Sequence, residues 1–142
     1  EIVNPEDTVY ILGDVAFMPA SKAAETVKRL NGRKILIEGN HDKKALKDPS
    51  FNKCFAEIHP YLEVNYNGHK ICMFHYPIAE WNQMHRGALH FHGHLHGNVS
   101  GLEGSRAIDV GMDATGWIVL EMEDAIARAA KGEIRTHHQK GE

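Results

Sequence analysis

A run of histidines is the first feature of this sequence that could do chemistry. The eight residues from position 90 to position 97, HFHGHLHG, contain four of them, namely His90, His92, His94 and His96. Neutral imidazole is the commonest metal ligand among side chains, but a chain with 11 histidines can also hold such a run by coincidence. The other polar residues of the sequence have to decide between a metal site and a coincidence.

Potential ligands also follow three other apolar runs. The runs are ILGD at 11–14, LIEGNH at 36–41 and CMFH at 72–75. Each is typical of a short buried strand that stops at a polar residue. Ligand sites in open α/β sheets lie beyond the carboxyl ends of the strands. We therefore expect Asp14, Asn40 and His75 to converge with the histidine run at one edge of a sheet.

Carboxylate, amide oxygen and imidazole form a mixed ligand set. This set suits Mn²⁺, Fe²⁺, Co²⁺, Ni²⁺ or Zn²⁺, whereas structural zinc sites are rich in thiolate. Cys54 and Cys72 form no paired-cysteine motif. A single carboxylate that bridges two ions about 3.5–4 Å apart, with neutral ligands on either side, suits the binding and hydrolysis of a phosphoryl group. The sequence therefore favours phosphoester hydrolysis at a two-metal centre.

The elements that would position these residues alternate along the chain. Apolar residues at helical spacing from Ser21, a possible cap, to Leu30 separate two buried strands and predict a strand–helix–strand unit. Asn67-Gly68 favours a tight type I′ hairpin turn between two further strands. We expect strands at 8–12, 34–37, 62–66, 70–74, 88–92, 107–110 and 117–120, and a last helix at 124–131.

Composition places the chain among ordinary globular proteins. Its 142 residues fit one domain, and 42% of them are hydrophobic and 25% charged. No apolar run approaches the roughly 18 residues of a membrane span. The formal charge of −3 argues against a broad basic surface for nucleic acid or anionic lipid. Two cysteines are too few for a disulfide framework, so we expect reduced thiols and a cytoplasmic protein without a membrane partner.

Four short motifs, taken in order, resemble those of a known family. Gly13-Asp14, Gly39-Asn40-His41-Asp42, His75 and Gly93-His94-Leu95-His96 resemble the calcineurin-like metallophosphoesterase superfamily, in particular its small single-domain bacterial and phage members. The resemblance runs from about Val9 to Leu120. It implies an α/β fold in which a β-sandwich is flanked by helices in α/β/β/α layers, and a single domain over residues 1–142.

The resemblance also implies a role for each motif residue. The implied metal ligands are Asp14, which bridges two ions, Asn40, His75 and His94 on one of these ions, and His96 on the other. His41 matches a residue that binds no metal but contacts the phosphate and protonates the leaving group. The implied cofactors are two divalent transition-metal ions from the series Mn, Fe, Ni, Co and Zn, with manganese favoured.

One family motif is missing from the chain. Members carry Asp-x-His on the first strand, upstream of Gly-Asp, and nothing before Asp14 can supply it. By this count one ion keeps four protein ligands, whereas the other keeps two, Asp14 and His96. The chain also begins without methionine. We therefore expect the domain to be incomplete at its N-terminus and to lack its first strand.

The neighbours of the motifs receive supporting roles. His90 and His92 fall on the strand itself, so we expect them to lie on one face of a pleat, with His92 orienting a ligand. Asp42 is expected to support the Asn40-His41 turn by hydrogen bonding.

Two further residues have two possible roles each, and a third is expected to have a structural role. Trp81 either stacks on a substrate base or closes the edge of the core, and the second reading is favoured. Arg86 either neutralises a phosphate or is a solvated surface residue, again with the second favoured. Asp109, after a short strand, is expected to form a turn.

The function expected from these residues is metal-dependent hydrolysis of a phosphodiester or phosphomonoester. Metal-activated hydroxide attacks phosphorus, and His41 protonates the leaving alkoxide. A small-molecule substrate is favoured because the sequence has no basic track. Two alternatives stay open: a nuclease with the same metal centre, and a non-catalytic metal-binding scaffold on this fold.

Overall fold

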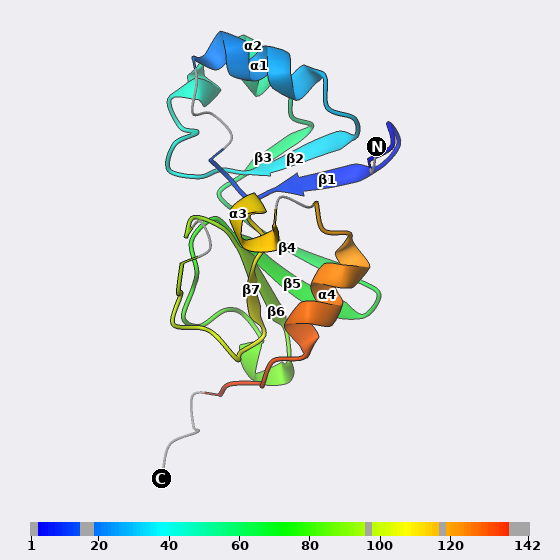
Figure 1. Cartoon of the computed structure of the whole chain (residues 1–142), viewed down its shortest axis with the longest axis vertical. Helices are drawn as coiled ribbons and strands as arrows, with labels where there is room; N and C mark the ends of the chain where they lie inside the picture. Colours follow the sequence, from blue (N-terminus) through cyan, green and yellow to red (C-terminus); the bar gives the residue numbers. More distant parts are fainter. Residues whose placement is uncertain (1–2, 15–18, 96–97, 117–118, 137–142) are drawn as a thin grey trace. The chain divides into compact units, whose positions relative to one another are not determined.

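The structure is a computed structural model of a mixed α/β chain (Figure 1). It describes residues 3–14, 19–95, 98–116 and 119–136. The chain divides into two compact units, residues 1–61 and residues 62–142. We describe each unit by itself and call them unit 1 and unit 2.

Unit 1 contains a parallel sheet of three strands. Its order is β1 (Thr8–Ile11), β2 (Arg33–Ile37) and β3 (Glu57–His59), with parallel pairing throughout. Helix α1 (Ala20–Lys28) connects β1 to β2. The predicted strand–helix–strand unit is therefore confirmed. The short strand β3 was not predicted.

Helix α1 begins two residues earlier than the sequence predicts. Pro19 occupies the N-cap position with extended backbone, and its carbonyl accepts hydrogen bonds from the N–H groups of Lys22 and Ala23. Ser21 lies inside the first turn, so the prediction that it caps the helix is wrong. The backbone of Pro19 is non-helical through its ψ of 143°, since the φ of −52° that the proline ring imposes also occurs in helices.

Two helices and a short turn form the core of unit 1 against one face of the sheet. These are α1, the 3-10 turn η1 (Ala45–Lys47) and the single-turn helix α2 (Pro49–Asn52). Their buried residues form one cluster with Leu36 of β2. Phe51 is completely buried and meets Phe55 edge to face, with ring centroids 5.2 Å apart. Removing a buried aromatic ring of this kind costs about 3–5 kcal/mol, so this cluster stabilises unit 1.

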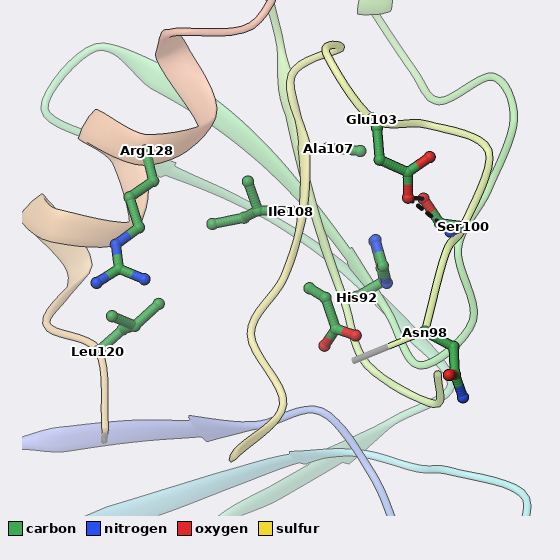
Figure 2. A pocket seen from close by; sticks show the side chains of 9 residues that line it. His92, Asn98, Ser100, Glu103, Ala107, Ile108, Leu120 and Arg128 are labelled. Carbon is green, nitrogen blue, oxygen red and sulfur yellow. Dashed lines mark hydrogen bonds between the residues drawn. The ribbon is translucent and has the colours of Figure 1, made fainter. Parts of the chain in front are cut away.

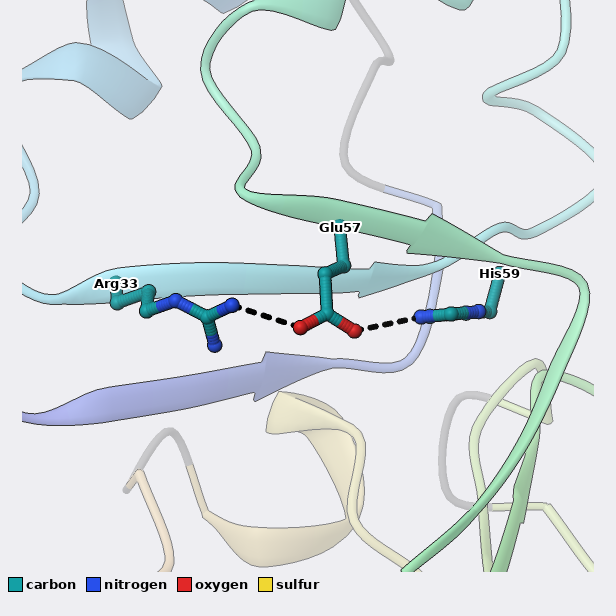
Figure 3. A network of polar contacts seen from close by, with 3 residues as sticks. All are labelled: Arg33, Glu57 and His59. Carbon is teal, nitrogen blue, oxygen red and sulfur yellow. Dashed lines mark hydrogen bonds and ion pairs between the residues drawn. The ribbon is translucent and has the colours of Figure 1, made fainter.

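Charged side chains line part of β2 and β3. Arg33 donates a hydrogen bond to Glu57 at 2.7 Å, and the other carboxylate oxygen of Glu57 lies 2.8 Å from Nε2 of His59 (Figure 3). Arg33 and Glu57 are exposed. Water therefore screens this network, and it contributes little to the pairing of the two strands.

Unit 2 contains a mixed sheet of four strands. Its order is β4 (Tyr61–Tyr66), β5 (His69–Phe74), β6 (Leu89–His92) and β7 (Ala107–Asp109). The two residues Asn67-Gly68 join β4 to β5, both with positive φ, as a type I′ turn requires. So short a turn makes β4 and β5 antiparallel, whereas β5–β6 and β6–β7 pair in parallel. The predicted hairpin is confirmed.

Helices cover the later strands of unit 2. Helix α4 (Met122–Ala130) contacts β6 and β7 through its buried residues Ala125, Ile126 and Ala129. A single-turn helix α3 (Met112–Thr115) follows β7, and a 3-10 turn η2 (Met84–Arg86) precedes β6. Of the strand predicted at 117–120, residues 117–118 lie outside the described residues, and 119–120 belong to no strand.

Two further observations concern the cysteines and the lengths of the helices. Both cysteines are free, and Cys72 is buried in the core of unit 2. Among the described residues, every helix is too short or too polar to cross a membrane.

Candidate metal centre

One buried carboxylate holds together the two segments that follow β1 and β2. Asp42 is completely buried. Its Oδ2 accepts hydrogen bonds from the backbone N–H of Asp14 at 2.7 Å and of Gly39 at 2.9 Å. Because β1 and β2 are parallel, the chain leaves both strands at the same edge of the sheet, and Asp42 joins the two exits. The prediction that Asp42 supports this turn by hydrogen bonding is confirmed.

Asp14 lies beside the turn that carries Asn40 and His41. Oδ1 of Asp14 accepts a hydrogen bond from the backbone N–H of His41 at 3.0 Å. Asp14 is half-buried, whereas Asn40 and His41 are exposed. Unit 1 therefore gathers all four of its candidate residues at one sheet edge, and two of them, Asn40 and His41, face solvent.

Unit 2 brings two candidate ligands into contact. Nε2 of His75 lies 3.2 Å from Nδ1 of His94, and the two rings meet edge to face with centroids 5.0 Å apart. His75 follows β5, and His94 comes two residues after the end of β6. The parallel pairing of these strands places both exits at one edge. The N–H of Gly93 then donates to the carbonyl of His75 at 2.9 Å and closes the approach.

Two of the candidate ligands have unusual backbone conformations. Asp14 has φ of 57° and His94 has φ of 74°, both in the left-handed region that residues with a Cβ rarely adopt. Each residue follows the end of a strand. Such conformations cost on the order of 1–3 kcal/mol and occur where the surrounding structure imposes them, often at functional sites. This signal cannot be read from residue types, so sequence reasoning could not use it.

Tyr76 is a site residue that sequence reasoning missed. Its ring lies 5.0 Å from that of His75 and 4.6 Å from that of His94, measured between centroids. Tyr76 is partly exposed. It therefore forms an aromatic wall along one side of the histidine pair, and its position directly after His75 was the available signal.

His90 is a structural residue of the core of unit 2. It is completely buried, with Nδ1 2.9 Å from the carbonyl oxygen of Cys72, and Nε2 accepts a hydrogen bond from the N–H of Ile78 at 3.0 Å. Nδ1 therefore carries the proton of a neutral ring. Burial lowers the pKa of His90 to about 4 because the charged form would lose its hydration. Both nitrogens are occupied, which fits the expectation that His90 is not a ligand.

His92 is also buried but lines a pocket. Its Nδ1 lies 3.2 Å from the carbonyl oxygen of Gly93. Burial lowers the pKa of His92, while the Gly93 carbonyl and the carboxylate of Asp109 act in the opposite direction. The contact with Gly93 connects His92 to the turn that presents His94, which agrees with a supporting role.

The two residues with alternative readings are placed by the structure. Trp81 is buried, its Nε1 donates to the carbonyl of Ala88 at 2.8 Å, and its ring lies 5.2 Å from that of His90. It closes the core, so stacking of Trp81 on a substrate base is excluded in this conformation. Arg86 is exposed in η2, as expected for a solvated surface residue. His96 lies outside the described residues.

The donor types present suit an intermediate divalent ion. Unit 1 offers a carboxylate and an amide oxygen after its strands, and unit 2 offers two imidazole nitrogens that already face each other. Mn²⁺, Fe²⁺ and Zn²⁺ accept such ligands. The residues present therefore fit a transition-metal ion in their chemistry.

Fold and site together define a mixed α/β protein whose candidate ligands follow the ends of parallel strands. No family model matches the chain. The chain is similar to a solved structure, which is described as that of the protein of unknown function AQ665 from Aquifex aeolicus. The two chains are 30% identical, with a TM-score of 0.60, and the match covers 82% of this chain and 73% of the other. The chain therefore belongs to the same family as this Aquifex aeolicus protein.

Two relatives from other organisms are also similar. The uncharacterized protein MJ1445 of Methanocaldococcus jannaschii is 35% identical over 99 residues, which cover 68% of this chain and 48% of that protein. The chain thus spans about half the length of this relative. The gene 66 protein of Mycobacterium phage D29 is 28% identical over 141 residues, covering 80% of this chain and 71% of the phage protein. These names state no activity, so a function has to be argued from the residues.

Proposed function

We propose that this protein is a metal-dependent phosphoesterase with the fold of the calcineurin-like metallophosphoesterases. The observation that carries the proposal is the histidine pair of unit 2, in which ring nitrogens of His75 and His94 lie 3.2 Å apart. Two ring nitrogens that face each other at a sheet edge can direct their lone pairs at one ion. The four sequence motifs in family order supply the second line of support.

The proposed ligands are the residues that match the family's motifs. Asp14, Asn40, His75 and His94 would hold one ion, and Asp14 with His96 would contribute to a second. When bound, the ions acidify the attacking water and neutralise charge on the phosphoryl group. Manganese is the favoured ion because carboxylate and amide oxygens accompany the imidazoles.

His41 is the proposed general acid. Its backbone N–H is fixed by Oδ1 of Asp14 at 3.0 Å, while the residue itself is exposed to solvent. An exposed imidazole on a backbone held in this way can reach a bound substrate and give a proton to the leaving alkoxide. Since His41 is not among the proposed ligands, its loss should lower turnover without removing the metal.

The substrate class proposed is a small phosphoester. The chain has a formal charge of −3, and a polymer substrate requires a basic track to hold its phosphates. This charge supports a small-molecule ester over a nucleic acid.

The test is hydrolysis of bis(p-nitrophenyl) phosphate with added Mn²⁺. On a phosphoester whose leaving group is an alkoxide, we expect His41→Ala to lower kcat by about 10²- to 10⁴-fold, with an unchanged metal content. On bis(p-nitrophenyl) phosphate the loss should be smaller, because p-nitrophenolate leaves without a proton. His85→Ala, an exposed histidine of η2 outside every motif, serves as the matched control and should keep full activity. Full activity of His41→Ala on the alkyl ester at the same metal content would refute the general-acid role. No hydrolysis with any of Mn²⁺, Fe²⁺, Co²⁺, Ni²⁺ or Zn²⁺ would overturn the enzymatic proposal.

A further inference from the structure

A pocket with polar and apolar walls lies beside the edge strand β7 in unit 2 (Figure 2). Its volume is about 260 Å³. Its lining residues include buried His92, half-buried Asp109, Glu103 and Arg128. His92 and Asp109 are partners in the register of β6 and β7. Paired residues on neighbouring strands project to the same face of a sheet, so both side chains reach the pocket from one face.

The turn that Asp109 forms uses only one of its two carboxylate oxygens. Oδ1 accepts a hydrogen bond from the N–H of Gly111 at 2.8 Å, which confirms the predicted turn. Oδ2 is buried and has no hydrogen-bond partner among the described residues. The great majority of buried polar atoms in native proteins have a partner. We therefore expect a hydrogen-bond donor at the second oxygen of Asp109.

The ring of His92 faces the same requirement. Its Nδ1 lies 3.2 Å from the carbonyl oxygen of Gly93, and a carbonyl can only accept. Nδ1 therefore carries the proton of the neutral ring, and Nε2 becomes an acceptor. Asp109 and His92 thus present two acceptors to one pocket. A single water molecule can donate to both, and the pocket is large enough to hold one.

His92 in turn is connected to the histidine pair. The carbonyl that it contacts belongs to Gly93, whose N–H donates to the carbonyl of His75 at 2.9 Å. The next residue, His94, has the left-handed backbone. The carbonyl of His92 accepts from the N–H of Val110 at 2.8 Å, which fixes the end of β6 to β7. A change in the ring of His92 therefore reaches the turn that sets His75 against His94.

We propose that Asp109 is a positioning residue for the metal centre and acts through His92. Oδ2 of Asp109 holds the water molecule that donates a hydrogen bond to Nε2 of His92. The ring proton then stays on Nδ1, which contacts the carbonyl oxygen of Gly93. The inference rests on the proposed function where it predicts metal affinity, but the tautomer of His92 is a property of unit 2 alone. Metal ligands held by such supporting groups typically lose about 10- to 100-fold in affinity when the support is removed.

Two variants of Asp109 separate positioning from charge. Asp109→Leu removes both oxygens, whereas Asp109→Asn keeps an acceptor for Gly111 and an amide group that can hold the same water molecule. Long-range ¹H–¹⁵N spectra of the imidazole report the tautomer of His92, and titration calorimetry with Mn²⁺ alone reports affinity. Asp124→Asn, which makes the same chemical change at an exposed position of α4, is the matched control.

We expect Asp109→Leu to mix the tautomers of His92 and to weaken Mn²⁺ binding by about tenfold. Asp109→Asn should keep the single tautomer and bind within about threefold of the parent, and Asp124→Asn should match the parent. If Asp109→Leu fails to fold, Asp109→Ser, whose hydroxyl can still accept from Gly111, replaces it with the same expectation.

Two outcomes would overturn the inference. One is a folded Leu or Ser variant with the parental tautomer of His92 and parental affinity. The other is an equal loss of affinity in the Asn and Leu variants with the tautomer unchanged, which would mean that only the charge matters. A parent chain that binds no Mn²⁺ would refute the proposed metal centre instead, and the imidazole spectra would still decide the role of Asp109.

Discussion

The two units hold their candidate site residues in different ways. In unit 1 a buried carboxylate, Asp42, accepts hydrogen bonds from the backbone of two chain segments. In unit 2 buried imidazoles do the corresponding job, with His90 placed between the carbonyl of Cys72 and the N–H of Ile78. Asp42 joins two segments that follow parallel strands, whereas His90 joins strand β5 to the segment that follows it, and the two residues use different hydrogen-bonding chemistry.

This difference follows from what each segment offers. The exits of β1 and β2 present backbone N–H groups, and a carboxylate can accept hydrogen bonds from several of them at once. The segments around β5 and β6 present a carbonyl on one side and an N–H on the other, and only a neutral imidazole is both donor and acceptor in one rigid ring. Unit 1 therefore depends on one charged acceptor, and unit 2 depends on its histidines remaining neutral.

The largest expected effect comes from removing the anchor of unit 1. Asp42→Ala leaves the N–H groups of Asp14 and Gly39 without their acceptor in a buried place. Hydrogen bonds to a charged group contribute about 1.5–3 kcal/mol each, so we expect a loss of about 3 kcal/mol or more in the free energy of unfolding. Hydrogen exchange of the amides in β1 and β2 measures the effect within unit 1.

Asp48→Ala is the control for this change. Asp48 caps α2 by accepting from the N–H of Ser50 at 2.9 Å, but it lies nearer the surface. Its loss should be smaller than that of Asp42. A loss from Asp42→Ala no greater than the loss from Asp48→Ala would refute the view that one buried carboxylate holds the two strand exits.

Acid should act next on unit 2. His90 has a pKa of about 4 in the folded chain against 6.5 as its ordinary value, so the unfolded chain takes up a proton first as the pH falls. Stability is thus complete above about pH 6.5 and is lost progressively down to pH 4. Linkage gives a loss of about 3 kcal/mol from His90 between pH 7 and pH 4.

The measurement is urea unfolding followed by tryptophan fluorescence, since Trp81 lies against His90. The variant His90→Gln is neutral over the whole range and should show a shallower loss of stability with falling pH than the parent. The same pH slope in both proteins would contradict the role given to His90.

Much of the fold was predictable because its strands are short apolar runs with clear ends. The turn at Asn67-Gly68 is required by backbone geometry that few dipeptides allow, and the hairpin there was correctly predicted. Strand β3 (Glu57–His59) was missed because it has three residues with polar side chains at both ends. Its pairing with β2 comes from the sheet around it, which no local pattern in the sequence announces.

The candidate site was predictable in its residues and in the support from Asp42, but not in its other neighbours. Residues after parallel strands meet at one edge, so Asp14 beside His41, and His75 beside His94, follow from strand order. The wall formed by Tyr76 and the free oxygen of Asp109 depend on side-chain packing and on register between β6 and β7. Those features arise only once the sheet is assembled.

The smallest expected effect concerns the exposed charges of unit 1, and it tests whether charge in general or one buried carboxylate matters there. Hydrogen bonds from His59 and then from Arg33 hold the pKa of Glu57 below its ordinary value. Arg33→Ala should therefore raise the pKa of Glu57 toward its usual range, which carboxyl ¹³C shifts measure against pH. Because water screens the pair, hydrogen exchange in β2 and β3 should stay near that of the parent. A destabilisation of unit 1 comparable to that of Asp42→Ala would mean that the surface network holds the strands, and the contrast between the two units would then no longer rest on a buried anchor.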